Sequence, residues 1–499
     1  MEEFSPHVPK ERLVYRLDVV RLLTHSLVML AGLSLVGCAV GPDYQRPEPS
    51  APTQWSRADA NANPGTHDGA PGDLSQWWRR MNDPLLSELV DQALQASPDL
   101  RQARARLREA RAQRAVAGSA LFPSAGASGS TSRNQSSRNA RSGDPGILFN
   151  AGFDASWELD VFGGVRRSIE AAEADQAAAL DSLNDTRVSL VAEVARNYFE
   201  VRSLQIRLGI ARDNLASQTE TFQLTEFRAK AGLVSSQDVE QARSNREQTV
   251  AYLPSLETSL AEAEHRLAVL LGKAPGTLHV RLAEGGGLPT EPAQVAVGIP
   301  ADTLRQRADV RAAERKLAAA TARVGVAEAA RYPSFKLSGS IGIEALTLAA
   351  SGNAVGALYS LLGGVTAPIF NAGRLRSQVE VQDAVREQAQ LTYEQTVLTT
   401  LQEVEDALVA LVNNRQRSEA LAHALEAARS AALIARQRYS AGVIDFQPVL
   451  DTERSVLSLE DSLASSRADG VLALIQLYKA LGGGWSPQAE SRPAGKDTP

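Results

Sequence analysis

The stretch AGSALFPSAGASGS at residues 117–130 has a counterpart later in the chain, AEAARYPSFKLSGS at residues 327–340. In both stretches a helix-forming sequence ends before a Pro-Ser pair, which is followed after three residues by Ser-Gly-Ser. The same offset (327 − 117 = 210) relates further pairs: Asp99 and Asp309, Arg101 and Arg311, Gly232 and Gly442, Gln237 and Gln447, and Gly272 and Gly482. Repetition on this scale predicts two copies of one unit, at residues 85–272 and 302–482.

Each copy is expected to fold as a helix, two strands, a long helix, a short turn and another helix. Residues 85–120 contain Pro only at position 98 and no Gly before 118, which favours a helix. Residues 165–230 contain one Gly and no Pro, which predicts a helix about 100 Å long at about 1.5 Å per residue.

Apolar residues recur along this long helix at spacings of three and four, as in a coiled coil. They are Val191, Val194, Tyr198, Val201 and Leu208 in the first copy, and Leu401, Val404, Leu408 and Leu411 in the second. The alternative is a solvated helix with apolar residues placed by chance. The shared register of the two copies favours the coiled coil.

The segments between the helices alternate apolar and polar residues with a period of two, which predicts strands. The apolar positions are Phe153, Ala155, Trp157, Leu159 and Val161 in the first copy, then Phe335, Leu337, Gly339, Ile341 and Ile343, followed by Leu361, Gly363, Val365, Ala367 and Ile369. A soluble sheet can show the same alternation. Strands of about ten residues are long enough to cross a bilayer when tilted.

The opposite face of the first copy's strand is acidic, with Asp154, Glu158 and Asp160. These carboxylates are expected to face a barrel lumen and favour cations, or instead to pair with Arg166 or Arg167. Four strands cannot close a barrel, and open strand edges are not tolerated in lipid. Subunits must therefore share a barrel, and three copies of the chain would give twelve strands.

The amino terminus has the pattern of an export signal. Basic residues precede an apolar run at residues 22–37, which is too short and polar for a convincing transmembrane helix. The run ends Leu-Val-Gly-Cys at Cys38, the only Cys of the chain, and resembles a bacterial lipobox. Residues 1–37 are thus expected to be a lipoprotein signal peptide, with Cys38 lipidated after cleavage; the alternative is an incidental Cys. Residues 41–72 are rich in Pro, Ala and Asn and are expected to form a tether.

The composition excludes several classes of protein. One Cys among 499 residues permits no intramolecular disulfide and no Cys-based metal site, and the six His show no metal-ligand spacing. Neither HExxH nor GxSxG is present, so we expect no metal, no cofactor and no enzymatic activity. A net charge of -6 provides no basic surface for nucleic acid. A mean hydropathy of -0.20 argues against a polytopic helical membrane protein.

Several motifs in a fixed order carry a family resemblance. They are the lipobox, Gly41-Pro42-Asp43-Tyr44, Trp77-Trp78, Asp83-Pro84, Pro98-Asp99-Leu100-Arg101, the paired Pro-Ser strand starts and the ending Leu477-Tyr478-Lys479-Ala480-Leu481-Gly482-Gly483-Gly484-Trp485. Together they resemble the TolC-type outer membrane efflux lipoproteins, in the NodT-type branch that serves resistance-nodulation-division pumps.

This resemblance implies an α+β membrane protein: a homotrimer whose twelve-stranded β-barrel in the bacterial outer membrane continues as a long α-helical periplasmic tunnel. An equatorial region would comprise residues 38–84, 273–301 and 483–499. The chain would be a passive exit duct for drugs or other small solutes delivered by an inner-membrane pump and a periplasmic adaptor. The alternatives are a type I protein-secretion exit channel and a lipid-anchored envelope scaffold without a pore.

The resemblance also implies a gate and a docking surface. The family closes its periplasmic end with Tyr, Asp and Arg side chains near the second repeat's turn, which correspond here to Tyr439, Asp451 and Arg454. An Asp–Arg pair between subunits would latch the closed state; alternatively the two form an i,i+3 pair on one helix. The apolar turns are expected to dock the adaptor. Their residues are Gly232, Leu233, Val234, Gly442, Val443 and Ile444.

Overall fold

The computed structural model describes residues 39–48, 52–56, 66–67, 73–134, 146–289, 295–345 and 357–486. The predicted signal peptide at residues 1–37, Cys38, and residues 487–499 of the predicted tail lie outside the described residues. The described chain divides into two units. One comprises Met1–Arg46, Glu109–Gln176 and Arg315–Gln390, and the other Pro47–Arg108, Ala177–Glu314 and Leu391–Pro499.

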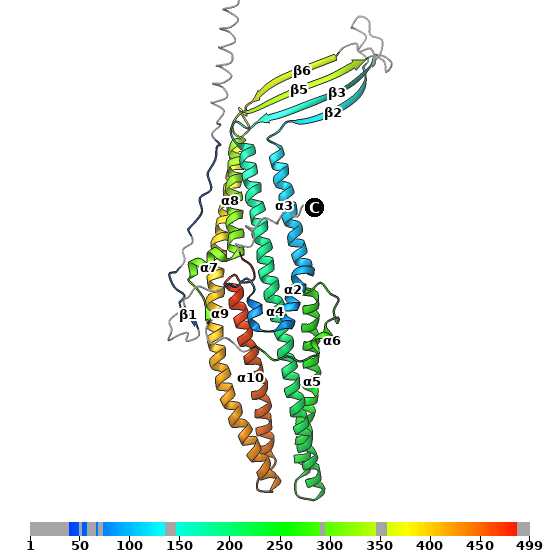
Figure 1. Ribbon diagram of the computed structural model, residues 1–499, viewed down its shortest axis with the longest axis vertical. Coiled ribbons are helices and arrows are strands. Elements are labelled where there is room, and N and C mark those ends of the chain that lie inside the picture. Colours follow the sequence, from blue (N-terminus) through cyan, green and yellow to red (C-terminus); the bar gives the residue numbers. More distant parts are fainter. Residues whose placement is uncertain are drawn as a thin grey trace, which may run out of the picture. The chain divides into compact units, whose positions relative to one another are not determined.

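The first unit contains a four-stranded antiparallel sheet (Figure 1). Its strands are β2 (Ser124–Asn134), β3 (Gly146–Leu159), β5 (Ser334–Ala345) and β6 (Ala357–Thr366), and they pair in the order β2-β3-β5-β6. Strands β2 and β6 are therefore the edges of the sheet. The strands hold 11, 14, 12 and 10 residues, which agrees with the predicted membrane-spanning length. Strand β6 ends before Ala367 and Ile369, so the prediction that these two residues continue the strand is wrong.

The register places apolar residues opposite one another on one face of the sheet. Phe153 lies opposite Ile341, which in turn lies opposite Tyr359. Trp157 lies opposite Leu337 on the same face. Phe153, Ile341 and Tyr359 are largely open in the single chain, at 67%, 61% and 86% exposed. The predicted alternation is thus present, and its apolar face has no cover from this chain's helices at these residues.

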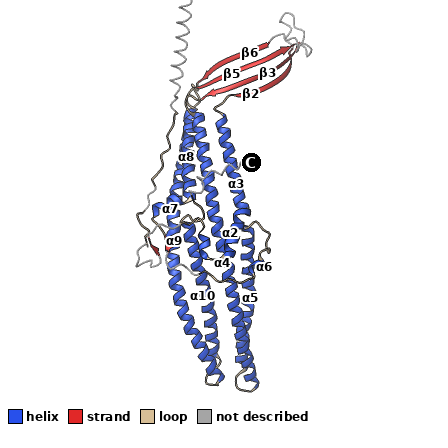
Figure 2. Cartoon of the chain, in the orientation of Figure 1, coloured by secondary structure: helices blue, strands red, loops and turns tan. Residues whose placement is uncertain are grey.

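Helices make up most of the described chain (Figure 2). The predicted long helix is α4 (Gly164–Lys230), and its counterpart in the second copy is α9 (Arg374–Ser440); each has 67 residues. The other helices of more than ten residues are α2 (Pro84–Ala96), α3 (Pro98–Ser119), α5 (Ser236–Leu270), α8 (Ala308–Ala329) and α10 (Gln447–Ala480). Among the described helices, none is long and apolar enough to cross a membrane.

Short elements lie between the long ones in the second unit. They are β1 (Thr66–His67), the 3-10 helix η1 (Trp77–Met81), α6 (His279–Leu282), β4 (Val295–Ala296) and α7 (Pro300–Gln306). Strands β1 and β4 pair in parallel. The tether and the linker between the copies are thus held together at this pairing.

The predicted helix over residues 85–120 is in fact two helices, α2 and α3, separated at Ser97. Pro98 disfavours a helical conformation at Ser97, whose ψ is 129°. The second copy breaks at the equivalent place, Arg307, although no Pro follows it. There the buried Arg307 side chain donates hydrogen bonds to Asp309, Glu403 and the carbonyl of Ala480.

The main core of the second unit gathers several of the motif residues. Trp77 and Trp78 are 0% and 1% exposed, and the ring of Trp77 lies 5.3 Å from that of Tyr478. Asp83 caps α2 by accepting from the Leu86 N–H, and its other carboxylate oxygen accepts from the Tyr198 hydroxyl at 2.6 Å. Burial, followed by this hydrogen bond, raises the pKa of Tyr198 to about 12. The neutral phenol therefore remains a donor to Asp83 at neutral pH.

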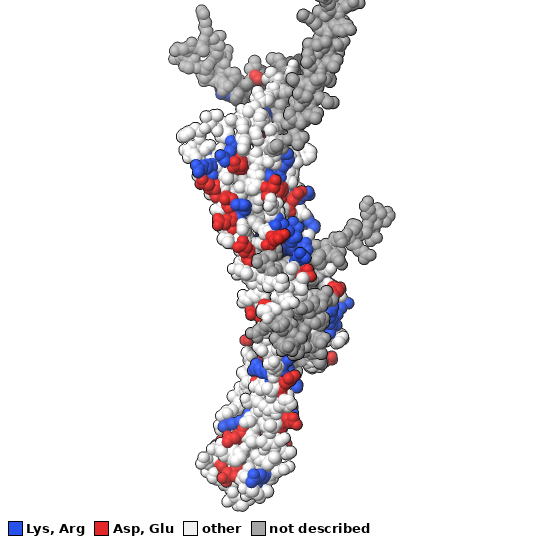
Figure 3. Space-filling view, turned by 90° about the vertical axis from the view of Figure 1, so that its left-hand side faces the viewer, with Lys and Arg blue, Asp and Glu red and all other residues white. Residues whose placement is uncertain are grey.

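The described charges are mixed in sign. On the face shown in Figure 3, acidic and basic side chains are interspersed over the helices. Within the first unit, Arg114 pairs with Glu173 at 2.6 Å and Arg323 pairs with Asp175. These half-exposed pairs contribute at most about 1 kcal/mol each, so the mixing bears on solubility and helix pairing more than on stability.

Candidate gate, coil tips and sheet face

Two helix pairs in the second unit end in turns of the same geometry. Gly232 and Gly442 have φ of 70° and 74°, a left-handed conformation that favours Gly. In the first turn, the Leu233 N–H donates to the Arg228 carbonyl and the Gly232 N–H to the Ala229 carbonyl, both at 2.9 Å. The second turn repeats both bonds at the equivalent residues, so each helix ends in a Schellman cap.

The two turns present one apolar side chain each. Leu233 is 67% and Val443 is 63% exposed. Val234 and Ile444 are instead partly buried against a cluster built on Tyr439 and Phe446. The expectation that all four apolar residues project from the tips is therefore wrong for Val234 and Ile444, because each turn folds its second apolar residue back onto the helices.

Tyr439 lies at the centre of this cluster and is 2% exposed. Its ring packs 5.6 Å from that of Phe446, and the Arg228 guanidinium lies 4.4 Å from its centroid. Arg228 also donates to the Tyr439 carbonyl, and the Tyr439 hydroxyl donates to Thr225 at 3.4 Å. Tyr439 thus joins α9 to α4 by packing, a cation–π contact and hydrogen bonds.

Asp451 and Arg454 do not form the i,i+3 pair within the described chain. Asp451 accepts from Gln447 on the same helix at 3.0 Å. Arg454 donates to Asn245 of α5, also at 3.0 Å. Asp451 and Arg454 are both exposed residues of α10. The structure therefore places the two predicted residues in separate contacts, and Arg454 already links α10 to the first helix pair.

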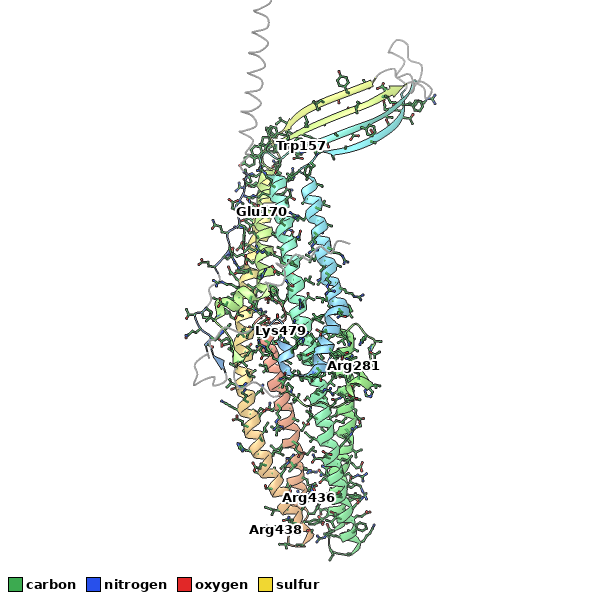
Figure 4. The ribbon with its side chains drawn as sticks, in the orientation of Figure 1. Trp157, Glu170, Arg281, Arg436, Arg438 and Lys479 are labelled. Atoms are coloured by element: carbon green, nitrogen blue, oxygen red, sulfur yellow. The ribbon has the colours of Figure 1, made fainter. Side chains whose placement is uncertain are left out.

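A buried acidic residue between them makes the stronger link. Glu453 is 4% exposed and accepts from Thr221 of α4 at 2.7 Å and from Arg436 of α9 at 3.0 Å. Arg436 also donates to Ser217 of α4. Figure 4 shows Arg436 near the ends of the helix pairs, two residues before Arg438. Burial raises the pKa of Glu453, while Thr221 and Arg436 oppose that rise by stabilising the carboxylate.

Further along the same helices, one more ionic contact joins α10 to α4 and another joins it to α9. Arg207 pairs with Asp461 at 2.7 Å and donates to Tyr252 of α5. The bond to Asp461 is the main cause that raises the pKa of Arg207. Glu460 accepts from Asn214 of α4 at 2.6 Å. It also pairs with Arg429 of α9 at 2.7 Å.

Sequence reasoning missed these residues, although one signal was available. Glu453 lies four residues after Val449, so both occupy one face of α10. Val449 is 0% exposed, and that face is the buried one. A carboxylate on a buried face requires a partner. The partners of Glu453 lie on α4 and α9, so no spacing along α10 indicates them.

Two hollows are lined in part by the residues of these contacts. The larger, about 690 Å³, is bounded by residues of α4, α9, α10 and the linker, among them Ile210, Pro289 and Arg467. The smaller, about 280 Å³, shares Arg429 and Glu460 with it. Gln218 lines the smaller hollow, is 3% exposed and has no hydrogen-bond partner for its amide among the described residues.

The three acidic residues of the sheet face separate into two groups. Asp154 and Glu158 lie within β3, with Asp154 opposite Ser340 and Glu158 opposite Lys336. Asp160 lies beyond the end of β3. Its carboxylate accepts from the backbone N–H groups of Val165 and Arg166 at 2.9 Å and pairs with the Arg166 side chain at 3.1 Å.

Asp160 therefore pairs with Arg166, as the alternative prediction had it, and caps the start of α4. Its expected position on the lumen-facing strand is wrong, because the strand ends one residue earlier. Lys336 also places a positive charge directly opposite Glu158. The predicted acidic face is consequently less acidic than the first copy alone indicates.

A four-stranded antiparallel sheet of membrane-spanning length, joined to long paired helices with glycine-capped tips, defines a channel subunit of the bacterial outer membrane. The sequence pattern of the family described as outer membrane efflux protein matches residues 89–273 and 299–483, one stretch for each predicted copy. The chain belongs to this family.

Similar proteins agree on the role. The chain is 33% identical over 466 residues to Nodulation protein T of Rhizobium leguminosarum bv. trifolii, covering 92% of this chain and 97% of that protein. It is 32% identical over 470 residues to the toluene efflux pump outer membrane protein TtgF of Pseudomonas putida, covering 93% and 97%. The solved structure of the outer-membrane channel OprN superposes with a TM-score of 0.83 at 36% identity, covering 90% of this chain and 100% of that one. This chain is thus an outer membrane efflux channel.

Proposed function

We propose that three copies of this chain form one passive duct, a twelve-stranded barrel continued by a helical tunnel. The observation that carries this proposal is the sheet order β2-β3-β5-β6, which leaves β2 and β6 as edges. Unpaired strand edges are not tolerated in lipid. Pairing β6 of one subunit with β2 of the next removes every edge once the ring closes. Under this proposal the two copies are residues 85–272 and 302–482, and residues 38–84, 273–301 and 483–499 form an equatorial belt.

The lower ends of the helix pairs would form the gate. Tyr439 and Glu453 fasten α9 and α10 to α4 within one subunit, which supports a closed arrangement held by polar contacts. The exposed Asp451 and Arg454 would add a latch to the neighbouring subunit. Asp154 and Glu158 would face the barrel lumen, where Lys336 moderates their preference for cations.

A periplasmic adaptor would dock on the tips through Leu233 and Val443, with Gly232 and Gly442 setting the turns and Val234 and Ile444 supporting them from inside. An inner-membrane resistance-nodulation-division pump would supply the energy, and this chain would carry out no catalysis. The name of TtgF refers to toluene efflux. Small aromatic or amphiphilic solutes are therefore the substrate class that we propose for this channel.

The amino terminus would be a lipid anchor. Signal cleavage before Cys38 and acylation of its thiol would fix the chain to the outer membrane lipid. Cys38→Ser should abolish incorporation of labelled fatty acid. Absence of the label from the wild type would reject the anchor.

The pore is tested by conductance of the purified protein in planar bilayers. Wild-type protein should give discrete channel openings, and the pair Asp451→Ala with Arg454→Ala should raise conductance by loosening the latch. No openings from any preparation would reject the duct and favour an envelope scaffold. Unchanged conductance of the double variant would reject only the latch.

The substrate class is tested in a strain lacking this gene and in its complemented parent. Solvents, dyes, detergents, aromatic acids and metal ions are compared. Sensitisation to aromatic or amphiphilic compounds, reversed by complementation, would support the proposal. Sensitisation only to metal ions, or only loss of a secreted protein, would contradict it.

A further inference from the structure

The segment that follows Cys38 is seated on the first unit by a buried arginine. Arg167 on the first turn of α4 is 6% exposed. It donates to the carbonyls of Val40 at 3.3 Å and Gly41 at 3.4 Å, and to the Asp43 carboxylate at 2.5 Å. The Val40 N–H donates to the Phe162 carbonyl at 3.2 Å. We call residues 39–43 the strap.

Arg167 is held in place by a second acidic residue. Its remaining nitrogen donates to Glu170, one turn further along α4, at 2.8 Å. Figure 4 shows Glu170 on α4 below the strands that carry Trp157. Glu170 thus orients the guanidinium of Arg167. The other hydrogen bonds of the Arg167 side chain go to the strap. The Arg167 side chain therefore makes more hydrogen bonds to the strap than to its own helix.

Glycines permit the close approach on both sides. A Cβ at Gly163 would lie 2.7 Å from the Cβ of Ala39, and a Cβ at Gly41 would lie 2.4 Å from the Cα of Gly325 on α8. A Cβ at Gly325 would lie 2.9 Å from the Cγ of Arg167. Such contacts are too short for carbon atoms, so the strap fits only where these side chains are absent.

The internal repeat provides a comparison within the same molecule. The residue equivalent to Gly325 in the first copy is Ala115 (325 − 115 = 210). At the start of the long helix the offset between the copies is 209, since Gly164 and Ser168 recur as Gly373 and Ser377, so the residue equivalent to Gly163 is Ala372 (372 − 163 = 209). The counterpart of Arg167 is Arg376, whose side chain is 81% exposed and pairs with Glu380 on its own helix. Of each equivalent pair, the residue that meets the strap is the glycine or the buried arginine, whereas its counterpart in the other copy is an alanine or an exposed arginine.

We propose that Arg167, Gly163 and Gly325 form a seat for the strap, which fixes the lipid anchor at the junction of β3 and α4 and clips the start of α4 to α8. Ala39, the first described residue after Cys38 in the sequence, lies against Gly163 between β3 and α4. Arg167 is the positioning residue. The location of the anchor rests on the proposed acylation of Cys38, whereas the seat itself rests on the contacts above.

The seat is tested by a distance measurement on the full-length protein purified from membranes. Nitroxide labels are placed on Gln45→Cys in the segment after the strap and on Val116→Cys of α3, which is 71% exposed. Labelled subunits are diluted with unlabelled ones, and pulsed electron paramagnetic resonance records the distribution of distances. Wild-type protein should give one narrow peak.

Arg167→Gln should reduce the ratio of seated to released strap about tenfold and broaden the distribution, because hydrogen bonds to a charged group are lost. Gly325→Ala, which restores the residue of the other copy, should broaden it as well. The matched controls are Arg376→Gln and Gly118→Ala, where a Cβ meets nothing within 4 Å. Both controls should keep the narrow peak.

If Arg167→Gln fails to accumulate, Asp43→Asn perturbs the same contact from the strap, since the Asp43 side chain is 85% exposed. A narrow peak in the Arg167, Asp43 and Gly325 variants, or a broad one in the wild type, would overturn the seat. Conductance and fatty-acid labelling of the same preparations separate the two proposals. A broad wild-type peak with a working pore refutes the seat alone, whereas a silent pore with a narrow peak refutes the duct alone.

Discussion

Arg436→Gln tests the ionic link that ties α10 to α9 and, through Ser217, the bond of Arg436 to α4. The substitution removes the cation from Glu453, which is 4% exposed, and also removes the bond to Ser217. Breaking a fully buried pair costs about 3–5 kcal/mol, but the Arg436 side chain is 44% exposed, so solvent reduces the effect to about 1–2 kcal/mol. This free energy corresponds to local opening that is about 5- to 30-fold more frequent.

The assay is hydrogen–deuterium exchange of the purified channel, read on peptides of α10 that contain Glu453 and Thr452. Local opening exposes these amides, so their exchange rate reports the free energy of opening. The control is Arg438→Gln on α9, the helix that also carries Arg436. Arg438 is exposed and has no side-chain partner among the described residues. Exchange that rises less than about twofold, or equally in both variants, would refute the reasoning.

The pH dependence gives a second, independent test of the same link. Burial already raises the pKa of Glu453 above its ordinary value of 4.5 in the folded state. Removing Arg436 takes away a cause that lowers this pKa, so it rises further. A raised carboxyl pKa means that the folded state binds the proton more tightly, so its stability increases as pH falls toward 4.5. The excess exchange of Arg436→Gln should therefore shrink at acid pH, and adding Glu453→Gln should remove this pH dependence.

Three further predictions concern the coil tips. Tyr439→Ala should lower the local stability of α9 by about 3–5 kcal/mol, because it removes a ring that is 2% exposed. Tyr439→Phe keeps the ring and should cost less than about 1 kcal/mol. Hydrogen–deuterium exchange on peptides of α9 compares the two variants. Gly442→Ala should cost about 1–2 kcal/mol because φ is 74°, and an unchanged unfolding midpoint would contradict this. Leu233→Ser with Val443→Ser should leave conductance intact but sensitise cells as the gene deletion does, and full resistance would contradict docking there.

The helices and strands were predictable where one periodic pattern ran for many residues. The 67 residues of α4 carry no Pro, and its predicted apolar seam from Val191 to Leu208 is buried, so local propensity and packing agree there. The break at Arg307 was not predictable in this way, since no Pro marks it. The buried Arg307 side chain at this break donates to acceptors on α8, α9 and α10, and such partners are set by tertiary packing.

The candidate site was predicted in part for the same reason. Gly232 and Gly442 could be identified because a left-handed helix end requires Gly whatever surrounds it. The partner of Arg454 is Asn245, and the partners of Glu453 lie on α4 and α9. Each of these contacts depends on how two helix pairs pack against each other. A sequence shows which residue is charged, but it does not show which distant residue meets it.

The strength of these links bears on how a partner opens the channel. The ionic contacts of Arg436, Arg207 and Arg429 with α10 are partly exposed and contribute about 1 kcal/mol each, in contrast to the buried tryptophan core of the same unit. Shifting a two-state gate from 1:99 to 99:1 requires about 5.5 kcal/mol of differential binding. An adaptor that bound three open tips could supply this with about 2 kcal/mol per subunit. Under the proposed gate, opening would require these polar links to break, while the tryptophan core would stay folded.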